Sequence, residues 1–350
     1  MKVLMKGNEA LAEAAIQAGC HHFFGYPITP QTELAAYMSK KMPKIGGTYL
    51  QAESEIAAIN MVLGAAATGV RAMTSSSSPG ISLKAEGISY MAGSDLPALI
   101  INVQRGGPGL GGIQPSQADY WQATKATGHG DFQILVYAPS TVQEMVDLVS
   151  KAFDTADKYR MPAMILADGM LGQMMEPVEL PDGKKDNIGE KPWAASGHQN
   201  KREHNIVNSL YLTPNALEDL VMERYNRYKT IQKNEQSAEE YLTEDADIVI
   251  AAYGASSRVA RSAVNKAREQ GIKAGLVRPI TLWPFPVDAI NNAAKNAKSL
   301  LVVEMSMGQM VDDVKLAVEC RLPVHFYGRT GGMIPTPGEV FGKIKELAES

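Results

Sequence analysis

Glu53 and Glu55 stand two residues apart where a predicted strand gives way to a predicted helix. A helix dipole favours a carboxylate near its N-terminus, so both acids fit as ordinary helix-start residues. The same placement also suits chemistry, because a carboxylate in a dry cleft couples strongly to a polar ligand atom and can exchange a proton with it. Both explanations remain open on the placement alone.

Arg105 precedes a run, residues 106–112, that contains five glycines. A guanidinium fork suits a carboxylate, and an arginine among glycines is better placed to face a ligand than an ordinary surface arginine. Residues 107–112 fit the pattern GxGxxG, but Pro115 argues against the helix start that would hold a dinucleotide. We therefore expect this run to form the wall of a cleft.

These residues lie on a chain whose periodicity indicates an α/β fold. Short apolar runs alternate with helix-period segments to about residue 170, as in βαβ units with a parallel sheet, and the order begins with a helix. The predicted strands are 21–26, 48–51, 70–74, 98–103, 134–137 and 163–166. Side chains placed to cap the helices are Asn8, Thr29, Ser54 and Thr141. Ligands bind beyond the carboxyl ends of parallel strands, where the candidate residues fall.

The pattern divides the chain into two α/β domains and a connection. Residues 1–180 form the larger domain and residues 245–350 the smaller one. The periodicity fails over residues 181–244, which we predict to be a connecting segment with one exposed helix. Residues 75–78 are four serines that either cap the next helix or line a cleft, and the sequence favours neither.

Composition excludes several classes of protein. The 34 Lys and Arg against 38 Asp and Glu give a net charge of −4, so a nucleic-acid surface is not supported. Cys20 and Cys320 are the only cysteines, too few for a disulfide framework or a cluster motif. Neither a signal peptide nor an apolar run of about eighteen residues is present, so we expect a cytoplasmic protein without a membrane span.

From Glu55 the spacing Glu-x-x-Ala-x-x-x-φ-x-Gly runs through Ala58 and Val62 to Gly64. It resembles the pyrimidine-binding domain of thiamine-diphosphate enzymes. In that superfamily the glutamate hydrogen-bonds the ring nitrogen of the aminopyrimidine and favours the imino tautomer that deprotonates the thiazolium carbon. Glu53 competes for this role, but its ninth following residue is Val62 instead of glycine. The resemblance therefore makes Glu55 the catalytic residue.

Longer motifs resemble the alpha subunit of 2-oxoacid:ferredoxin oxidoreductases along essentially the whole chain. They are Lys6-Gly7-Asn8-Glu9-Ala10, Gly25-Tyr26-Pro27-Ile28-Thr29-Pro30, Thr74-Ser75-Ser76-Ser77-Ser78-Pro79-Gly80, Arg105-Gly106-Gly107-Pro108-Gly109 and residues 276–286. The resemblance implies a pyrimidine-binding-type parallel-sheet domain and a smaller α/β domain similar to the transketolase C-terminal domain. Among subfamilies the chain looks most like the alpha subunit acting on branched-chain 2-oxoacids such as 3-methyl-2-oxobutanoate.

The resemblance also implies roles for single residues. Arg105 matches the arginine that clamps the 2-oxoacid carboxylate, and Thr29 matches a threonine near thiamine and that carboxylate. The implied contacts to thiamine diphosphate are Tyr26, Pro27, Ile28, Thr29, Glu55, Ser76 and Ser77. No metal ligand is assigned to this chain.

Half of the cofactor site is missing from the sequence. Thiamine-diphosphate enzymes bind the diphosphate through a divalent metal on a Gly-Asp-Gly motif, whereas Ala167-Asp168-Gly169 lacks the first glycine. Two cysteines cannot hold a cluster either. The resemblance thus implies a beta subunit carrying Mg²⁺, the diphosphate and a 4Fe-4S cluster. It also implies a separate gamma subunit, because no gamma domain is fused here, and a small ferredoxin-like subunit.

The implied reaction is oxidative decarboxylation of a 2-oxoacid with coenzyme A, giving acyl-CoA and carbon dioxide and reducing ferredoxin. The cofactor supplies the carbanion chemistry. Glu55 would activate the thiamine, and Arg105 and Thr29 would orient the carboxylate of the 2-oxoacid. One alternative is the 2-oxoglutarate enzyme, whose second substrate carboxylate requires another cation in the cleft. The other is a noncatalytic assembly or binding subunit.

Overall fold

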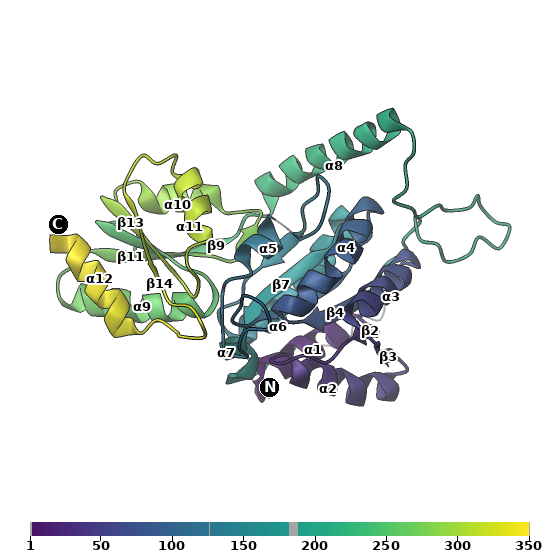
Figure 1. Cartoon of the computed structure of the whole chain (residues 1–350), viewed down its shortest axis with the longest axis horizontal. Helices are drawn as coiled ribbons and strands as arrows, with labels where there is room; N and C mark the ends of the chain where they lie inside the picture. The colour runs from purple at the N-terminus through teal and green to yellow at the C-terminus, as the bar shows by residue number, and fades with distance from the viewer. Residues whose placement is uncertain (1, 126, 182–187, 350) are drawn as a thin grey trace.

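The computed structural model describes residues 2–125, 127–181 and 188–349, which form two α/β lobes side by side (Figure 1). In the first lobe the strand order is β12-β6-β7-β5-β4-β2-β3, with β12 antiparallel to β6 and the other neighbours parallel. The strands are β2 (His22–Gly25), β3 (Thr48–Gln51), β4 (Ala72–Ser76), β5 (Leu99–Gln104), β6 (Leu135–Tyr137), β7 (Ala163–Asp168) and β12 (Thr281–Trp283).

Helices cover both faces of this sheet, as its continuous apolar strands require. Figure 1 shows α3 and α4 on one face and α1 and α2 on the other. The helices are α1 (Gly7–Gln17), α2 (Thr32–Lys41), the 3₁₀ turn η1 (Met42–Ile45), α3 (Glu55–Ala67), α4 (Ser78–Gly93), α5 (Tyr120–Thr124), α6 (Val142–Tyr159) and α7 (Gly169–Gln173). The predicted parallel α/β architecture is confirmed.

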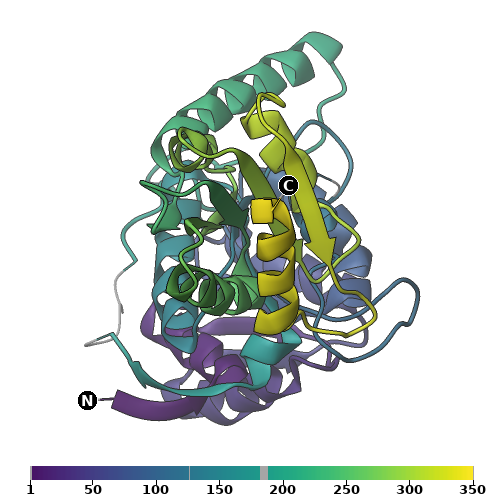
Figure 2. The same cartoon turned by 90° about the vertical axis from the view of Figure 1, so that its left-hand side faces the viewer.

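The second lobe has the strand order β14-β13-β10-β11-β9. Its strands are β9 (Ala238–Tyr241), β10 (Ile248–Ala251), β11 (Ala274–Pro279), β13 (Ser299–Glu304) and β14 (Val324–Gly328). Its helices are α9 (Gly254–Glu269), α10 (Val287–Ala294), α11 (Met310–Ala317) and α12 (Pro337–Glu349). Figure 2 shows α12 beside α9, and the two helices pack together.

Several predictions about helix starts are wrong. The chain begins with β1 (Lys2–Lys6), which pairs with β8 (Met175–Glu179), and not with a helix. The Asn8 side chain does not cap α1, because its amide donates to the Pro30 carbonyl at 2.8 Å and to Glu33. Thr29 does not cap α2 either, since that helix begins three residues later.

Two other predicted caps are confirmed. The Ser54 hydroxyl accepts from the Ala57 N–H at 3.2 Å at the start of α3. The Thr141 hydroxyl accepts from the Glu144 N–H at 3.1 Å at the start of α6. Each satisfies one of the amides that a helix start leaves unpaired. Ser54 thereby fixes the turn that carries the candidate acid.

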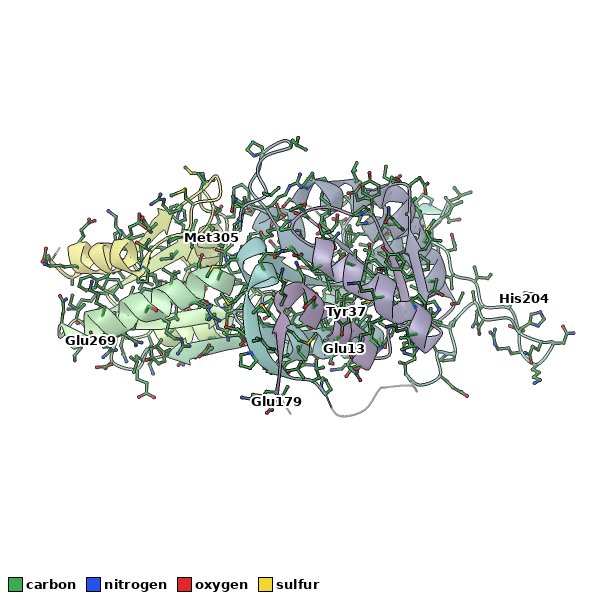
Figure 3. The ribbon with its side chains drawn as sticks, turned by 90° about the horizontal axis from the view of Figure 1, so that it is seen from below. Glu13, Tyr37, Glu179, His204, Glu269 and Met305 are labelled. Atoms are coloured by element: carbon green, nitrogen blue, oxygen red, sulfur yellow. The ribbon has the colours of Figure 1, made fainter. Side chains whose placement is uncertain are left out.

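The connection between the lobes contains α8 (Pro214–Asn234), preceded by an extended segment, residues 188–213. Its first part packs against the first lobe, where Lys191 pairs with Asp157 and Ala194 is buried, and a later part stands away from the body of the chain (Figure 1). Figure 3 shows His204 at the far end of this segment. Helix α8 is anchored by Arg224, whose guanidinium donates to Asp95 and to the Gly93 carbonyl. None of the described helices has the length and apolar run needed to cross a bilayer.

Gln117 joins the two lobes through hydrogen bonds of both its side chain and its main chain. Its amide nitrogen donates to the Tyr253 carbonyl at 2.8 Å, and its amide oxygen accepts from the Ser256 hydroxyl at 2.6 Å and the Met305 N–H at 3.0 Å. Its own N–H donates to the Met305 carbonyl at 2.9 Å. Figure 3 shows Met305 at the junction of the lobes. The ion pair of Arg278 with Glu144, at 2.6 Å, adds a second link.

Gln117→Leu is expected to lower the free energy of unfolding by at least about 2 kcal/mol, because it leaves the Ser256 hydroxyl and the Met305 N–H buried and unpaired. Urea unfolding of the full chain measures this. Gln232→Leu, a matched change on the exposed face of α8, is the control and stays within about 0.5 kcal/mol of the original chain. Equal loss in the two variants contradicts the role of Gln117.

Candidate active site

The carboxyl ends of β2, β3, β4 and β5 meet at one edge of the first sheet, where ligands of open parallel sheets bind. The segment after β2 carries Thr29, and the residue after β5 is Arg105. These two are brought together, because the Arg105 Nη1 donates to the Thr29 carbonyl at 3.0 Å. The turns after β3 and β4 bring Glu55 and the serines to the same edge.

Glu55 is the first residue of α3 and is buried, whereas Glu53 is exposed. Its carboxylate lies against α4 at Gly80: a Cβ built there stands 2.7 Å from the Glu55 Oε1 and 2.0 Å from the Ser76 Oγ. Only glycine at position 80 lets the Glu55 carboxylate and the Ser76 hydroxyl come this close to the main chain of α4. Two helices begin here, and both dipoles favour an anion at this point.

Ser76 and Ser77 are fully buried, and neither hydroxyl has a hydrogen-bond partner among the described residues. No described side chain donates a hydrogen bond to the Glu55 carboxylate either, so one carboxylate and two hydroxyls at this edge lack a side-chain partner among the described residues. Buried polar groups are normally paired, and a group of unpaired ones is a common mark of a ligand site. Of the two interpretations of the serine run, the helix cap is not observed, because the Ser77 side chain makes no capping hydrogen bond at the start of α4. That the hydroxyls line a cleft stays a prediction.

The segment from Tyr26 to Thr29 is fixed by hydrogen bonds of Gln31, a residue that the sequence analysis missed. Gln31 is fully buried; its amide donates to the Tyr26 carbonyl at 3.3 Å and accepts from the Ser75 hydroxyl at 2.6 Å. Tyr26, Pro27 and Thr29 themselves are exposed, and Ile28 is half-buried. The segment thus offers its side chains outward from a fixed backbone.

Arg105 is 7% exposed and joins two loops. Besides the Thr29 carbonyl, its guanidinium donates to the Leu110 carbonyl at 3.1 Å, while the Nε has no partner among the residues described. Its main chain is held by Ser78, whose hydroxyl accepts from the Arg105 N–H at 3.0 Å. One donor of a buried cation is therefore still available to an anion.

Asp119 is a second residue that the sequence analysis missed. Its carboxylate accepts from the Ser78 hydroxyl at 2.6 Å and from the Asn102 amide at 2.9 Å. Burial raises the pKa of Asp119, while these two hydrogen bonds and the charge of Arg105 oppose the rise. Asn102 was the available signal, since an amide is unusual inside the apolar strand β5.

Residues 106–112 form an irregular loop without the helix start that a dinucleotide site requires. That this loop is the wall of a cleft stays a prediction. Gly111 has φ of 58°, and a Cβ there would stand 1.9 Å from the Gly106 carbonyl oxygen. Leu110 at the tip is 84% exposed. The glycines allow the loop to fold tightly back on itself beside the arginine.

Asp168 lies at the end of β7 and is fully buried. Its carboxylate caps α7, accepting from the Met170 N–H at 2.9 Å and the Leu171 N–H at 3.1 Å. Burial raises the pKa of Asp168 to about 6 against the lowering effect of these hydrogen bonds. Among the described residues, no three His, Cys, Asp or Glu side chains, whether or not they include Asp168, converge on a point that could hold a metal.

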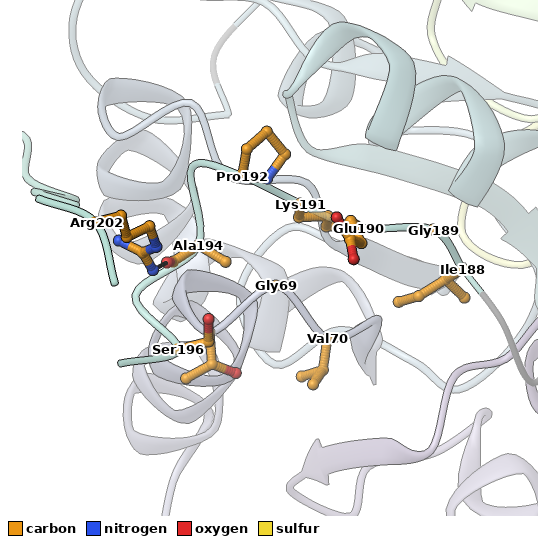
Figure 4. Close-up of a pocket in the computed structure, with 11 residues that line it drawn as sticks. Gly69, Val70, Ile188, Gly189, Glu190, Lys191, Pro192, Ala194, Ser196 and Arg202 are labelled. Carbon is orange, nitrogen blue, oxygen red and sulfur yellow. Dashed lines mark hydrogen bonds between the residues drawn. The ribbon is translucent and has the colours of Figure 1, made fainter. Parts of the chain in front are cut away.

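A cavity of about 490 Å³ lies at the opposite end of α3 from Glu55 (Figure 4). It is bounded by Gly69 and Val70 on one side and by residues 188–192 on the other. Arg202 on its rim donates to the Ala194 carbonyl at 3.3 Å. None of the candidate residues lines this cavity, so the edge of the sheet remains the candidate active site.

Two family models match the chain. The first, described as pyruvate flavodoxin/ferredoxin oxidoreductase, thiamine diphosphate-binding, covers residues 13–244. The second, described as pyruvate:ferredoxin oxidoreductase core domain II, covers residues 246–340. An inactive beta4 tetramer of a split-gene transketolase matches 99% of the chain with a TM-score of 0.61 at 13% identity, which shows a shared fold alone.

More similar proteins carry more specific names. Ketoisovalerate oxidoreductase subunit VorB of Methanothermobacter marburgensis is 49% identical over 345 residues, 99% of this chain and 97% of that protein. 2-Oxoglutarate synthase subunit KorA of Methanothermobacter thermautotrophicus is 36% identical and covers 98% of each. The 2-oxoglutarate:ferredoxin oxidoreductase of Magnetococcus marinus, solved with 2-oxoglutarate, coenzyme A and succinyl-CoA, has a TM-score of 0.88 at 28% identity; this chain spans 65% of that chain.

The parallel sheet and the first family model together define a thiamine-diphosphate-binding class of fold. Within that class, the chain belongs to the 2-oxoacid:ferredoxin oxidoreductase family, as a subunit of an oxidoreductase enzyme. The resemblance found in the sequence is confirmed.

Gly80→Ala is expected to destabilise the chain by about 1–3 kcal/mol, because the new methyl group collides with the Ser76 hydroxyl and the Glu55 carboxylate. Gly64→Ala on α3 is the matched control, since a Cβ there meets no atom of the described chain within 4 Å. Alanine favours a helix, so this control gains up to about 1 kcal/mol. Urea unfolding measures both, and equal stability of the two variants contradicts the close packing at Gly80.

Proposed function

We propose that this chain is the alpha subunit of a thiamine-diphosphate-dependent 2-oxoacid:ferredoxin oxidoreductase and supplies the pyrimidine half of its active site. The observation that carries the proposal is the buried Glu55 carboxylate at the edge of the sheet, beside two buried serine hydroxyls that lack a partner among the described residues. The family model with a thiamine-diphosphate description covers the same residues.

The polar groups at this edge fit an aminopyrimidine ring. Such a ring offers nitrogen acceptors and an amino donor, while Glu55, Ser76 and Ser77 offer one carboxylate and two hydroxyls that can donate or accept. Thiamine diphosphate, when bound, supplies the carbanion chemistry of decarboxylation. Glu55 would hold or accept the proton at the ring nitrogen, and the segment Tyr26–Thr29, fixed by Gln31, would form the neighbouring wall.

Arg105 fits the carboxylate of a 2-oxoacid. Its Nε is available, its side chain is buried, and its position is fixed by the carbonyls of Thr29 and Leu110. A buried guanidinium binds a carboxylate with charge-assisted hydrogen bonds that are stronger than neutral ones. Thr29, whose carbonyl accepts from Arg105, has an exposed side chain, and its hydroxyl would orient the same carboxylate.

The substrate we favour is a branched-chain 2-oxoacid, 3-methyl-2-oxobutanoate, oxidised with coenzyme A to acyl-CoA and carbon dioxide while ferredoxin is reduced. The VorB relatives at 49% identity support this choice. The KorA relatives at 36% identity and the solved structure with 2-oxoglutarate support 2-oxoglutarate as the second candidate.

The proposed site needs a partner. We infer a beta subunit that carries Mg²⁺, the diphosphate site and a 4Fe-4S cluster, together with gamma and ferredoxin-like subunits. Relatives named as subunits support an assembly. Beside Glu55, the apolar side chains of Ile56 on α3 and Leu83 on α4 are 48% and 49% exposed, and Gly64 faces open space. Such a face suits burial against another subunit.

Glu55→Gln in the reconstituted complex is expected to lower thiamine-dependent carbon dioxide release by at least about 100-fold, because an amide cannot exchange the proton of the ring nitrogen. Glu53→Gln, two residues away and exposed, is the matched control and keeps the original rate. Release of labelled carbon dioxide from the 1-¹³C 2-oxoacid measures both. Near-normal turnover of Glu55→Gln would show that Glu55 does not act in the reaction, and it would contradict the proposed role of the site.

Arg105→Leu is expected to raise the KM for the 2-oxoacid roughly 10- to 100-fold with a smaller change in kcat, because one charged hydrogen-bonding group is lost. Arg105→Lys keeps the charge without the fork and recovers part of the affinity. Initial rates with 3-methyl-2-oxobutanoate and 2-oxoglutarate in competition measure both KM and substrate preference. An unchanged KM contradicts the proposal that Arg105 binds the substrate carboxylate. A preference for 2-oxoglutarate would make 2-oxoglutarate the substrate in place of 3-methyl-2-oxobutanoate.

A further inference from the structure

Lys84, on the second turn of α4, is fully buried and has no role in the site as described so far. Its Nζ donates to the main-chain oxygen of Glu55 at 3.3 Å, and the described residues provide it with no other hydrogen bond or ion pair. Gly80 lies four residues earlier, so both face α3. The same face of α4 therefore contacts the Glu55 carboxylate through Gly80 and its carbonyl through Lys84.

Glu55 is the only charged group on α3, and the facing strands β4 and β5 carry none. The other titratable groups on and around α4 have other partners or are exposed. On α4 itself, Glu86 accepts from Tyr90. On the neighbouring elements, Glu53 is exposed, Asp119 accepts from Ser78 and Asn102, His129 meets the Tyr90 ring edge-on, and His22 lies at the amino end of β2. Among the described residues, Glu55 is thus the anion that faces Lys84.

This arrangement is costly for folding. Burial lowers the pKa of Lys84 to about 8, and the negative charge of Glu55 opposes that change. An ammonium that leaves water for one neutral carbonyl oxygen is poorly compensated, and an apolar side chain of similar length would be cheaper at this position. A lysine kept where it weakens the fold points to a function, because functional sites are where such costs are tolerated.

We propose that Lys84 is a positioning residue for Glu55: its buried ammonium holds the carbonyl of the first residue of α3 and provides a fixed positive neighbour for the carboxylate. The carboxylate is thereby directed into the cleft, where it meets the ring nitrogen of the aminopyrimidine. This inference rests on the proposed function and extends it to a residue of the α3–α4 contact.

The first test is stability as a function of pH. Below pH 8 the folded chain bears the buried charge of Lys84; as the pH rises from about 8 to 10.5, the ordinary lysine pKa, folding releases that proton and the original chain gains stability. Lys84→Met is expected to unfold at a urea midpoint at least as high as the original chain at pH 7, with the difference falling over this interval. Lys40→Met, on an exposed face of α2, shows no such pH dependence.

A clear loss of stability of Lys84→Met at pH 7 would mean that the ammonium is structural, and it overturns the proposal. Lys84→Gln, which keeps a donor for the Glu55 carbonyl without the charge, is the second variant. If neither variant folds, the charge is needed for folding itself, which also overturns the proposal.

The second test is binding of thiamine diphosphate to the reconstituted complex, measured by calorimetry at pH 7. Lys84→Met is expected to weaken binding at least 10-fold, and Lys84→Arg, which restores the charge, to recover part of it. Equal binding by the original and Lys84→Met complexes overturns this inference and leaves the proposed function intact. If the original complex itself binds no thiamine diphosphate, it is the proposed function that fails.

Discussion

The close approach of α3 and α4 at their first turns is the constraint on which the candidate site depends. Gly80 permits it, since any side chain there would overlap the Ser76 hydroxyl and the Glu55 carboxylate. Further along, Gly87 contacts Ile59 in the same way, so the two helices stay close over several turns. Because both helices begin at this contact, the acid lies where two helix dipoles favour negative charge. The packing of the fold and the electrostatics of the site are therefore the same feature.

Around this contact, polar groups divide into those satisfied within the chain and those that are not. Asp119, Asn102 and Ser78 pair with one another and with the main chain of Arg105, which makes them a support. In contrast, the Ser76 and Ser77 hydroxyls and the Arg105 Nε have no partner within the described residues. Buried groups of the second kind destabilise a protein unless a ligand or another chain completes them. Their position at the strand ends matches where such folds bind ligands.

The sequence predicted what depends on local pattern. The apolar runs of β4, β5 and β7 and the Ser54 cap are confirmed because burial on both faces and capping leave marks within a few residues. Pairings between distant segments leave no such mark, so β1 and β12 were missed. Lys84 was missed for another reason. A single lysine on a helix is normally exposed, and Lys84 is buried in a helix that packs closely on α3 at Gly80 and Gly87, a contact between distant segments.

Strand β12, from the C-terminal half, completes the edge of the first sheet by pairing with β6. During synthesis, β6 leaves the ribosome more than 140 residues before its partner at Thr281, and until then its outer row of N–H and C=O groups is unprotected. Open strand edges are templates for association with other chains. The nascent N-terminal lobe thus passes through a stage in which a chaperone or another chain can occupy that edge, and the stage ends only when the second lobe has begun to emerge.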